Sequence, residues 1–307
     1  MRSRLSLYDA VAHRAADLVV REYSTSFGLA TRILPAQQRG RIRDVYALVR
    51  LADEVVDGAT EEVGGDVEDA RMRLDALEAE TELAMRTGYS TNVLVHAFAR
   101  TAREAGFGSE LTAPFYASMR MDLDTTRHDE ASFARYVYGS AEVVGLMCLR
   151  IFLLEEPSSV RDSRYRELTS GARALGAAFQ KINFLRDLAD DAVRLGRSYF
   201  VAVDPHHVTE EQKSAVLADI AEDVRVARDA IHRLPPSVRP AVAVACELFA
   251  ELTRRLEATP AQDLLTTRAS VPTAVKVRIA GRALREHGQV STTLLARAGG
   301  RPAGAVR

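Results

Sequence analysis

Two acidic segments of this chain carry side chains that could bind a metal ion. The first carries Asp53 and Asp57, and the second carries Asn183, Asp187 and Asp191. Within each segment these side chains are four residues apart, so on a helix they lie on one face. Carboxylates that leave water together repel each other unless a positive charge lies between them. The spacing therefore predicts that each segment contributes ligands to a cation.

The residue types in these segments indicate which metal and which ligand would bind. Oxygen donors from aspartate and asparagine favour Mg²⁺, with Mn²⁺ as an alternative, over zinc or copper. Arg50 and Arg186 accompany the two segments and could bind the oxygens of a diphosphate that the metal carries. Arg197 could close over the same group, although a surface loop position explains it equally well. Metal and arginines gathered around a diphosphate would stabilise it as a leaving group.

The surroundings of both acidic rows indicate an apolar cavity. Within residues 42–57 a polar row begins at Tyr46 and runs beside an apolar stripe, and within residues 180–191 a second row begins at Gln180 and has apolar neighbours on both sides. A diphosphate that departs in such a cavity would leave an allylic carbocation, which the faces of aromatic rings could stabilise. The candidate rings, each of which could instead serve core packing, are Phe27, Tyr138 and Phe179.

Helical periodicity dominates the chain, and we find no alternating strand pattern. The predicted helices span residues 5–21, 36–57, 66–86, 90–105, 111–123, 130–154, 162–193, 209–233, 238–258 and 272–287. Because the acidic segments lie in different halves and no linker separates the halves, we expect a single all-α domain over residues 1–295. Residues 296–307 are small, include glycine and proline, and are predicted to be a disordered tail.

Composition narrows the class of protein. The 307 residues are 47% hydrophobic and 27% charged, which is typical of a globular protein with a large core. A formal net charge of -1 with scattered basic residues predicts no nucleic-acid partner. The N-terminus lacks the pattern of a signal peptide, and no apolar run reaches transmembrane length, so we expect a cytoplasmic protein. Peripheral contact with a membrane stays open because the substrate would be greasy, and the oligomeric state is not determined.

The remaining polar residues give weaker signals. Cys148 and Cys246 offer neither a disulfide framework nor zinc spacing. Asp122 and Asp124 form a further acidic patch with Arg127, which could border the cavity, but a solvated helix end is the preferred interpretation.

The motifs resemble those of the squalene/phytoene synthase family, and within it those of bacterial phytoene synthases. The likeness covers residues 20–285 and includes an opening block that ends in the first acidic segment, a central helix and the second acidic segment. The matching stretches are residues 23–27, 34–35, 46–57, 136–145, 179–187 and 196–200. The resemblance implies a class I isoprenoid-synthase helical fold with a central cavity.

The resemblance also implies a prenyltransferase of carotenoid biosynthesis. Its reaction would be the Mg²⁺-dependent, head-to-head condensation of two geranylgeranyl diphosphates to phytoene through prephytoene diphosphate, without NADPH. The metal ligands that it implies are Asp53, Asp57, Asn183, Asp187 and Asp191. The residues that it implies to be catalytic are Asp53, Asp57, Asp187, Asp191, Tyr138 and Arg50. The residues that it implies to contact the substrate are Tyr23, Ser24, Ser26, Phe27, Tyr46, Arg50, Gln180, Asn183, Arg186 and Arg197.

Some positions depart from the family pattern and keep alternatives open. Glu142 occupies a position that is often glycine, so it either faces away from the cavity or changes the charge of the cavity, and Val201 replaces a usual proline. The floor residues that set prenyl chain length cannot be identified from one sequence. A squalene, dehydrosqualene or presqualene-diphosphate synthase using farnesyl diphosphate is therefore an alternative. A non-catalytic helical assembly module is another, and it would gain no thermal stability from Mg²⁺ with diphosphate.

Overall fold

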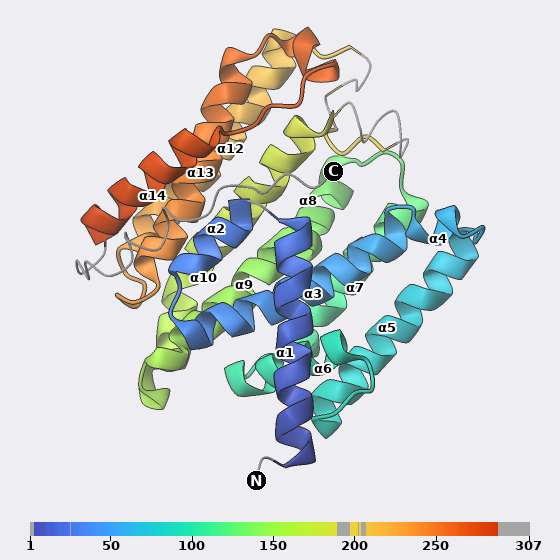
Figure 1. Cartoon of the computed structure of the whole chain (residues 1–307). Helices are drawn as coiled ribbons and strands as arrows, with labels where there is room; N and C mark the ends of the chain where they lie inside the picture. Colours follow the sequence, from blue (N-terminus) through green and yellow to red (C-terminus); the bar gives the residue numbers. More distant parts are fainter. Residues whose placement is uncertain (1–2, 25, 189–196, 202, 204–206, 288–307) are drawn as a thin grey trace, which may run out of the picture.

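The fold is all-α, as predicted (Figure 1). The computed structural model describes residues 3–24, 26–188, 197–201, 203 and 207–287, with only the main chain of residues 26 and 27. Its helices are α1 (Arg4–Tyr23), α2 (Ser26–Ile33), α3 (Ala36–Val56), α4 (Ala59–Glu62), α5 (Val67–Thr87), α6 (Val93–Ala105), α7 (Ser109–Asp124), α8 (Glu130–Val137), η1 (Tyr138–Glu142), α9 (Val143–Phe152), η2 (Leu153–Glu155), α10 (Ser158–Arg186), α12 (Glu210–Ile231), α13 (Arg239–Ala258), η3 (Ala261–Leu265) and α14 (Thr273–His287). Within the described residues the β-type pairing is a single isolated bridge between Arg127 and Ser198. The predicted tail, residues 296–307, lies outside the described part.

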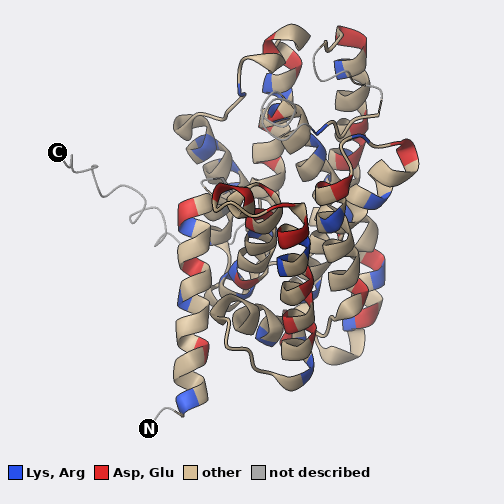
Figure 2. Ribbon diagram, turned by 90° about the vertical axis from the view of Figure 1, so that its right-hand side faces the viewer, with Lys and Arg blue, Asp and Glu red and all other residues tan. Residues whose placement is uncertain are grey.

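The helices form two groups with the longest helix, α10, between them. In Figure 1, α12, α13 and α14 lie on the upper left, and α1, α3, α5, α6 and α7 lie on the lower right. Helix α10 packs against α12 and α13 on one side and against η1 and α9 on the other. The halves that carry the two acidic segments therefore share one core, which includes Leu48, Met147 and Ile182. Acidic and basic positions are interleaved along the helices in Figure 2.

Helix boundaries differ from the predictions at several places, three of which lie near the acidic segments or the cavity. Helix α2 was not predicted, because 8 residues are too few to display a 3.6-residue period, and it gains its stability by packing against α13. A single turn, α4, lies between the predicted helices 36–57 and 66–86, where no helix was predicted. The predicted helix 162–193 corresponds to α10, which ends at Arg186 because Asp187 leaves the helical conformation with φ -101° and ψ 10°. Residues 189–193 of that prediction lie outside the described part.

The run from α8 to η2 is the central helix of the molecule. Residues 138–142 form one π-helical turn, η1, within it. By length and composition Glu130–Glu155 could cross a membrane, but 56% of its apolar window is buried inside the protein. It meets α10 at very short range, because a Cβ on Gly145 would lie 2.4 Å from the Ala172 carbonyl oxygen and one on Gly176 would lie 2.5 Å from that of Ala141. Glycine at these positions lets the two helix backbones touch.

Candidate active site

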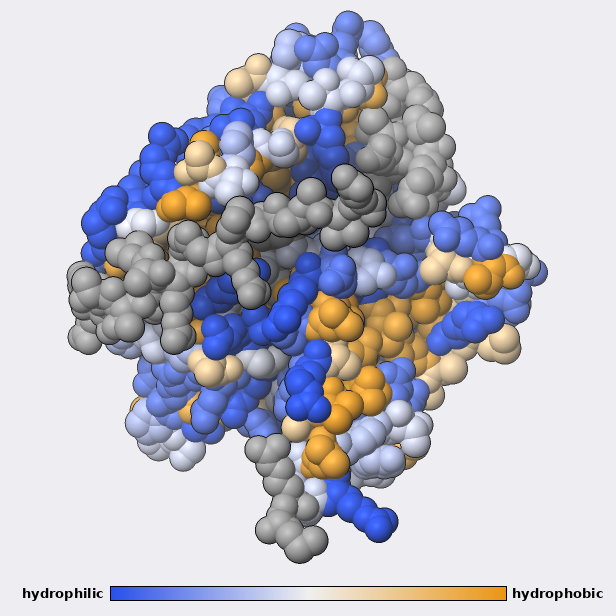
Figure 3. Space-filling view, viewed as in Figure 1, coloured by the Kyte–Doolittle hydropathy of each residue, from blue (hydrophilic) through white to orange (hydrophobic). Residues whose placement is uncertain are grey.

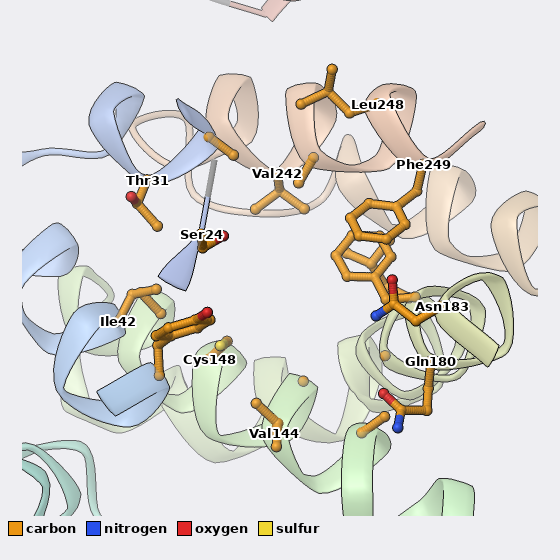
Figure 4. A pocket seen from close by; sticks show the side chains of 18 of the residues that line it. Ser24, Thr31, Ile42, Val144, Cys148, Gln180, Asn183, Val242, Leu248 and Phe249 are labelled. Atoms are coloured by element: carbon orange, nitrogen blue, oxygen red, sulfur yellow. The ribbon is translucent and has the colours of Figure 1, made fainter. Parts of the chain in front are cut away.

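A cavity of about 730 Å³ opens between the two groups of helices. Figure 4 shows its walls: Val144 and Cys148 from α9 lie on one side, and Val242, Leu248 and Phe249 from α13 lie on the other. Such a volume lies in the usual range for a ligand site, and apolar walls with few polar groups are typical of one. The cavity therefore has the shape and lining for a mostly hydrocarbon ligand with a polar end.

The first polar row reaches this cavity from α3. Tyr46, Arg50 and Asp53 all line it, one helical turn apart, as predicted from their spacing. Burial raises the pKa of Asp53 to about 8, and the nearby Asp57 carboxylate adds to the effect. Asp57 follows the last residue of α3 and is not among the lining residues. A carboxyl pKa raised mainly by burial means that the ionised form of Asp53 is disfavoured here unless a positive group lies beside it.

Arg50 is held between the first row and the end of α1. Its guanidinium pairs with Glu54 and lies over the ring of Tyr23, with 4.5 Å from its Cζ to the ring centroid. Its Nε is buried and makes no hydrogen bond within the described part of the chain. One donor of Arg50 is thus available to an anion. Tyr23 and Ser24 line the same end of the cavity, whereas the predicted side chains of Ser26 and Phe27 lie outside the described residues.

The second polar row reaches the cavity from α10. Gln180 and Asn183 project from this helix at the cavity wall in Figure 4, and Arg186 also lines the cavity. Asp187 accepts hydrogen bonds from Arg186 Nε at 2.9 Å and from Arg268 Nε at 2.7 Å. Burial alone would raise the pKa of Asp187, but the hydrogen bonds from the two arginines lower it below its usual value. The predicted ligand Asp191 lies outside the described residues.

Arg268 is a site residue that the sequence interpretation missed. It lines the cavity together with Lys276, and both come from the segment around the start of α14. This segment lies about 80 residues beyond the second acidic motif, so no local spacing pointed to it.

Arg197 is buried beside the end of the first row, with 7% of the residue exposed. Its Nη1 lies 3.0 Å from Asp57 Oδ1, and its Nη2 donates to the Val56 carbonyl oxygen at 2.7 Å. It is not among the residues that line the cavity. The sequence left two interpretations of Arg197 open, contact with the diphosphate and a surface loop position. The structure excludes the surface position, because Arg197 is buried and binds Asp57, a predicted metal ligand.

The prediction that Asp122 belongs to a solvated helix end is wrong. Its side chain is 5% exposed and accepts hydrogen bonds from Tyr136 Oη at 2.8 Å and Tyr199 Oη at 3.2 Å. Burial raises the pKa of Asp122 to about 7, although Arg197 opposes the shift. Its partners come from α8 and from residues 197–200, so the sequence alone gave no signal that joined them.

The aromatic candidates occupy different environments. Phe179 lines the cavity and stacks on Phe249, with ring centroids 3.8 Å apart and an interplanar angle of 16°. Tyr138 begins the π-helical turn and is not among the lining residues; Arg173 lies over its ring at 5.2 Å. Glu142 pairs with Arg173 at 2.5 Å and is likewise not a lining residue. Of the two interpretations of Glu142, the structure favours the one in which it faces away from the cavity.

The donor set fits a magnesium ion with diphosphate better than a closed protein cage. Among the described residues no group of three His, Cys, Asp or Glu side chains is arranged to hold a metal. Mg²⁺ usually takes one or two carboxylates and completes its shell with water and substrate phosphate, so no such cage is required. The carboxyl groups of Asp53 and Asp122 could bind a cation, and the Nε of Arg50, which makes no hydrogen bond to the described residues, could bind an anion.

The family model of squalene/phytoene synthase matches residues 20–274, which include every described member of both polar rows. The chain belongs to the squalene/phytoene synthase family. As a family member it is a prenyltransferase, of the type that joins two prenyl diphosphates head to head.

Curated relatives and solved structures agree with this membership. A phytoene synthase from Pseudescherichia vulneris is 28% identical over 254 residues, which cover 76% of this family member and 79% of the relative. One from Mycobacterium tuberculosis is 30% identical over 191 residues, which cover 61% of this chain and 57% of the relative. A crystal structure of a dehydrosqualene synthase superposes with a TM-score of 0.74 at 19% identity, covering 91% and 97% of the two chains. At that identity the superposition speaks for the fold alone.

Proposed function

We propose that this protein condenses two molecules of geranylgeranyl diphosphate to phytoene through prephytoene diphosphate, with Mg²⁺ and without a reductant. The observation that carries the proposal is that Asp53 and Asn183, from the two acidic segments, line one apolar cavity. Several curated relatives named phytoene synthase support the geranylgeranyl substrate. Prenyl chains would fill the apolar part of the cavity, and the diphosphates would lie at its polar end.

The residues at the polar end would divide the work of releasing diphosphate. Asp53, Asp57, Asn183, Asp187 and Asp191 would hold Mg²⁺. When bound, Mg²⁺ neutralises the charge of the diphosphate and makes it a better leaving group. The arginines that line the cavity, Arg50, Arg186 and Arg268, would bind the phosphate oxygens.

The apolar part of the cavity would protect the cation that forms when diphosphate leaves. The C1 carbon of one substrate would then bond to the C2–C3 double bond of the other, and loss of a proton would complete the cyclopropyl intermediate. Once prenyl chains fill the cavity, its apolar walls would exclude the water that could capture the cation, and the stacked rings of Phe179 and Phe249 would offer their faces to it. Loss of the second diphosphate, rearrangement and loss of a second proton would then give phytoene.

The test is direct. Purified protein with Mg²⁺ and geranylgeranyl diphosphate, and no NADPH, should yield phytoene and two equivalents of diphosphate, whereas a matched reaction with a chelator should yield neither. Supplying farnesyl and geranylgeranyl diphosphate together, with products identified by mass spectrometry, separates phytoene formation from the farnesyl-using alternative. Consumption of neither substrate would refute the proposal and favour a non-catalytic assembly module.

We further propose that the protein is cytoplasmic and contacts the anionic surface of a membrane through α1. Leu7, Val11 and Leu18 are 55%, 39% and 57% exposed and lie at helical spacing on one stripe, with Arg4 and Arg14 exposed on the same stripe. Apolar residues with interleaved arginines are typical of a helix that lies in a membrane interface. Figure 3 shows apolar surface beside α1, which ends at the cavity. Replacing the two leucines with serine should abolish cosedimentation with anionic vesicles, and unchanged cosedimentation would contradict this proposal.

A further inference from the structure

Asp122 is a buried carboxylate for which the proposed reaction has no use. It lies in the last turn of α7, where the helix dipole disfavours negative charge, and its side chain is 5% exposed. Its Oδ2 accepts a hydrogen bond from Tyr136 at 2.8 Å, its Oδ1 accepts one from Tyr199 at 3.2 Å, and Arg197 Nη1 lies 3.7 Å from Oδ1. A negative charge in so unfavourable a position needs partners to stabilise it. The three partners, Tyr136, Tyr199 and Arg197, each contact a residue in or beside one of the acidic segments.

These partners connect Asp122 to both acidic segments. On one side Arg197 reaches Asp57 at 3.0 Å, at the end of α3. On the other side the ring of Tyr199 stacks on Phe184, which follows Asn183 in α10, with centroids 4.0 Å apart and an interplanar angle of 10°. A main-chain hydrogen bond from Ser198 to Thr126, 2.8 Å long, ties the same segment to the turn after α7. Asp122 thus lies where three distant parts of the chain meet.

We propose that Asp122 is a positioning residue that holds Arg197 and Tyr199 in place and sets how readily Asp57 accepts a metal ion. The inference rests on the proposed function, since it concerns the magnesium site of that reaction.

The physical reason is competition for one carboxylate. Arg197 already neutralises Asp57, so a metal ion that binds Asp57 must take the place of the guanidinium or share the carboxylate with it. A buried guanidinium without a partner is strongly unfavourable. Because Asp122 lies 3.7 Å from the same Nη1, Arg197 keeps an anionic partner when Asp57 turns to the metal. Asp122 also adds negative charge near the cation, so both effects favour metal binding.

The decisive variant is Asp122→Asn, which keeps the shape of the side chain and removes its charge. Thermal unfolding is followed as Mg²⁺ is titrated at a fixed concentration of inorganic pyrophosphate, because a ligand that binds the folded state raises Tm. We expect the Mg²⁺ concentration at half-maximal stabilisation to rise about tenfold, equivalent to about 1.4 kcal/mol of binding free energy. In steady-state assays the Mg²⁺ requirement should rise similarly, while kcat at saturating Mg²⁺ falls much less.

Matched controls separate positioning from general stability. Asp44→Asn removes another buried carboxylate, bonded to Thr101 at 2.7 Å on the opposite side of α3 from the cavity lining. Tyr136→Phe deletes one hydroxyl that holds Asp122, and Tyr116→Phe deletes a buried hydroxyl of α7 that bonds Thr81 at 2.8 Å. Whatever each variant does to stability in the absence of ligand, only the changes at Asp122 and Tyr136 should move the Mg²⁺ midpoint, with the smaller movement for Tyr136→Phe.

The outcomes are distinguishable. If wild-type protein responds to Mg²⁺ with pyrophosphate and the midpoint of Asp122→Asn is unchanged, this inference is refuted and the proposed function survives. If Asp122→Asn does not fold, the Mg²⁺ midpoints of Tyr136→Phe and Tyr116→Phe are compared instead. An unchanged midpoint for Tyr136→Phe would then refute this inference. A wild-type protein that responds to neither ligand would refute the proposed function together with this inference.

Discussion

Replacing Asp53 with asparagine should stabilise the metal-free protein while abolishing its activity. Burial raises the pKa of Asp53 from 3.8 to about 8 in the folded chain, and the carboxylates of Asp57, Asp122 and Glu54 add to the effect, while Arg50 opposes it. A carboxyl whose pKa is higher in the folded state than in the unfolded state costs stability wherever the unfolded chain is ionised. The asparagine variant removes that cost and also removes the proposed metal ligand.

The magnitude follows from the size of the pKa shift. Each unit of pKa difference between the folded and unfolded states corresponds to about 1.36 kcal/mol of stability. Between the unfolded pKa of Asp53 and neutral pH, this sets an upper limit of about 4 kcal/mol on the stability that the variant can gain. Asp53 lines an open cavity, and water that enters it reduces the cost, so we expect a gain of about 1–2 kcal/mol. For a domain of this size each kcal/mol raises Tm by about 2–4 °C. The stability of Asp53→Asn relative to wild type should not differ below about pH 4, should increase as pH rises, and should level off above about pH 8.

The assay is thermal unfolding of wild-type protein and Asp53→Asn in chelator, across that pH range, repeated with Mg²⁺ and pyrophosphate. Wild-type protein should be less stable than the variant in chelator and should gain more when both ligands are added. A variant that unfolds at lower temperature than wild type at neutral pH in chelator would refute the view that uncompensated charge is stored at this position.

Three further results are expected. Stability should fall as pH rises above about 6.5, because a hydrogen bond to Asp44 raises the pKa of His13 in the folded state. The Tm of His13→Gln, measured over the same pH range, should therefore depend less on pH. Gly176→Ala should destabilise by about 1–3 kcal/mol in urea unfolding, because its Cβ would lie 2.5 Å from a carbonyl oxygen of η1, whereas Gly40→Ala in α3, with open space around it, should not. Cys148→Phe should fill part of the apolar wall and shift substrate preference in competition assays toward the shorter diphosphate.

Local geometry explains why much of this architecture could be predicted from the sequence. The spacing of Tyr46, Arg50 and Asp53 requires only that α3 be helical for the three side chains to share a face, and the structure has them on one wall of the cavity. The same holds for Gln180 and Asn183 in α10. Long periodic helices such as α3 and α10 were predicted for the same reason, because apolar periodicity over many turns is a local signal.

Features that depend on distant contacts could not be predicted. The environment of Asp122 is created by side chains from α8 and from residues 197–200, so its own neighbours in sequence predicted only an exposed helix end. Arg268 approaches Asp187 across about 80 residues. Helix α2 owes its stability to α13 rather than to its own period. The side of the central helix on which Glu142 lies likewise became clear only from its pairing with Arg173.

The close approach of α9 and η1 to α10 also limits how this cavity can change. Four small residues from these helices line the cavity: Ala141, Gly145, Ala172 and Gly176. At the two glycines, the main chain of the opposite helix lies directly against the glycine. No point substitution can remove a peptide group, so at these two contacts the cavity can be narrowed but not widened. Evolution toward bulkier prenyl chains would therefore have to trim whole side chains elsewhere on the wall, such as Val144 of α9 or Phe249 of α13.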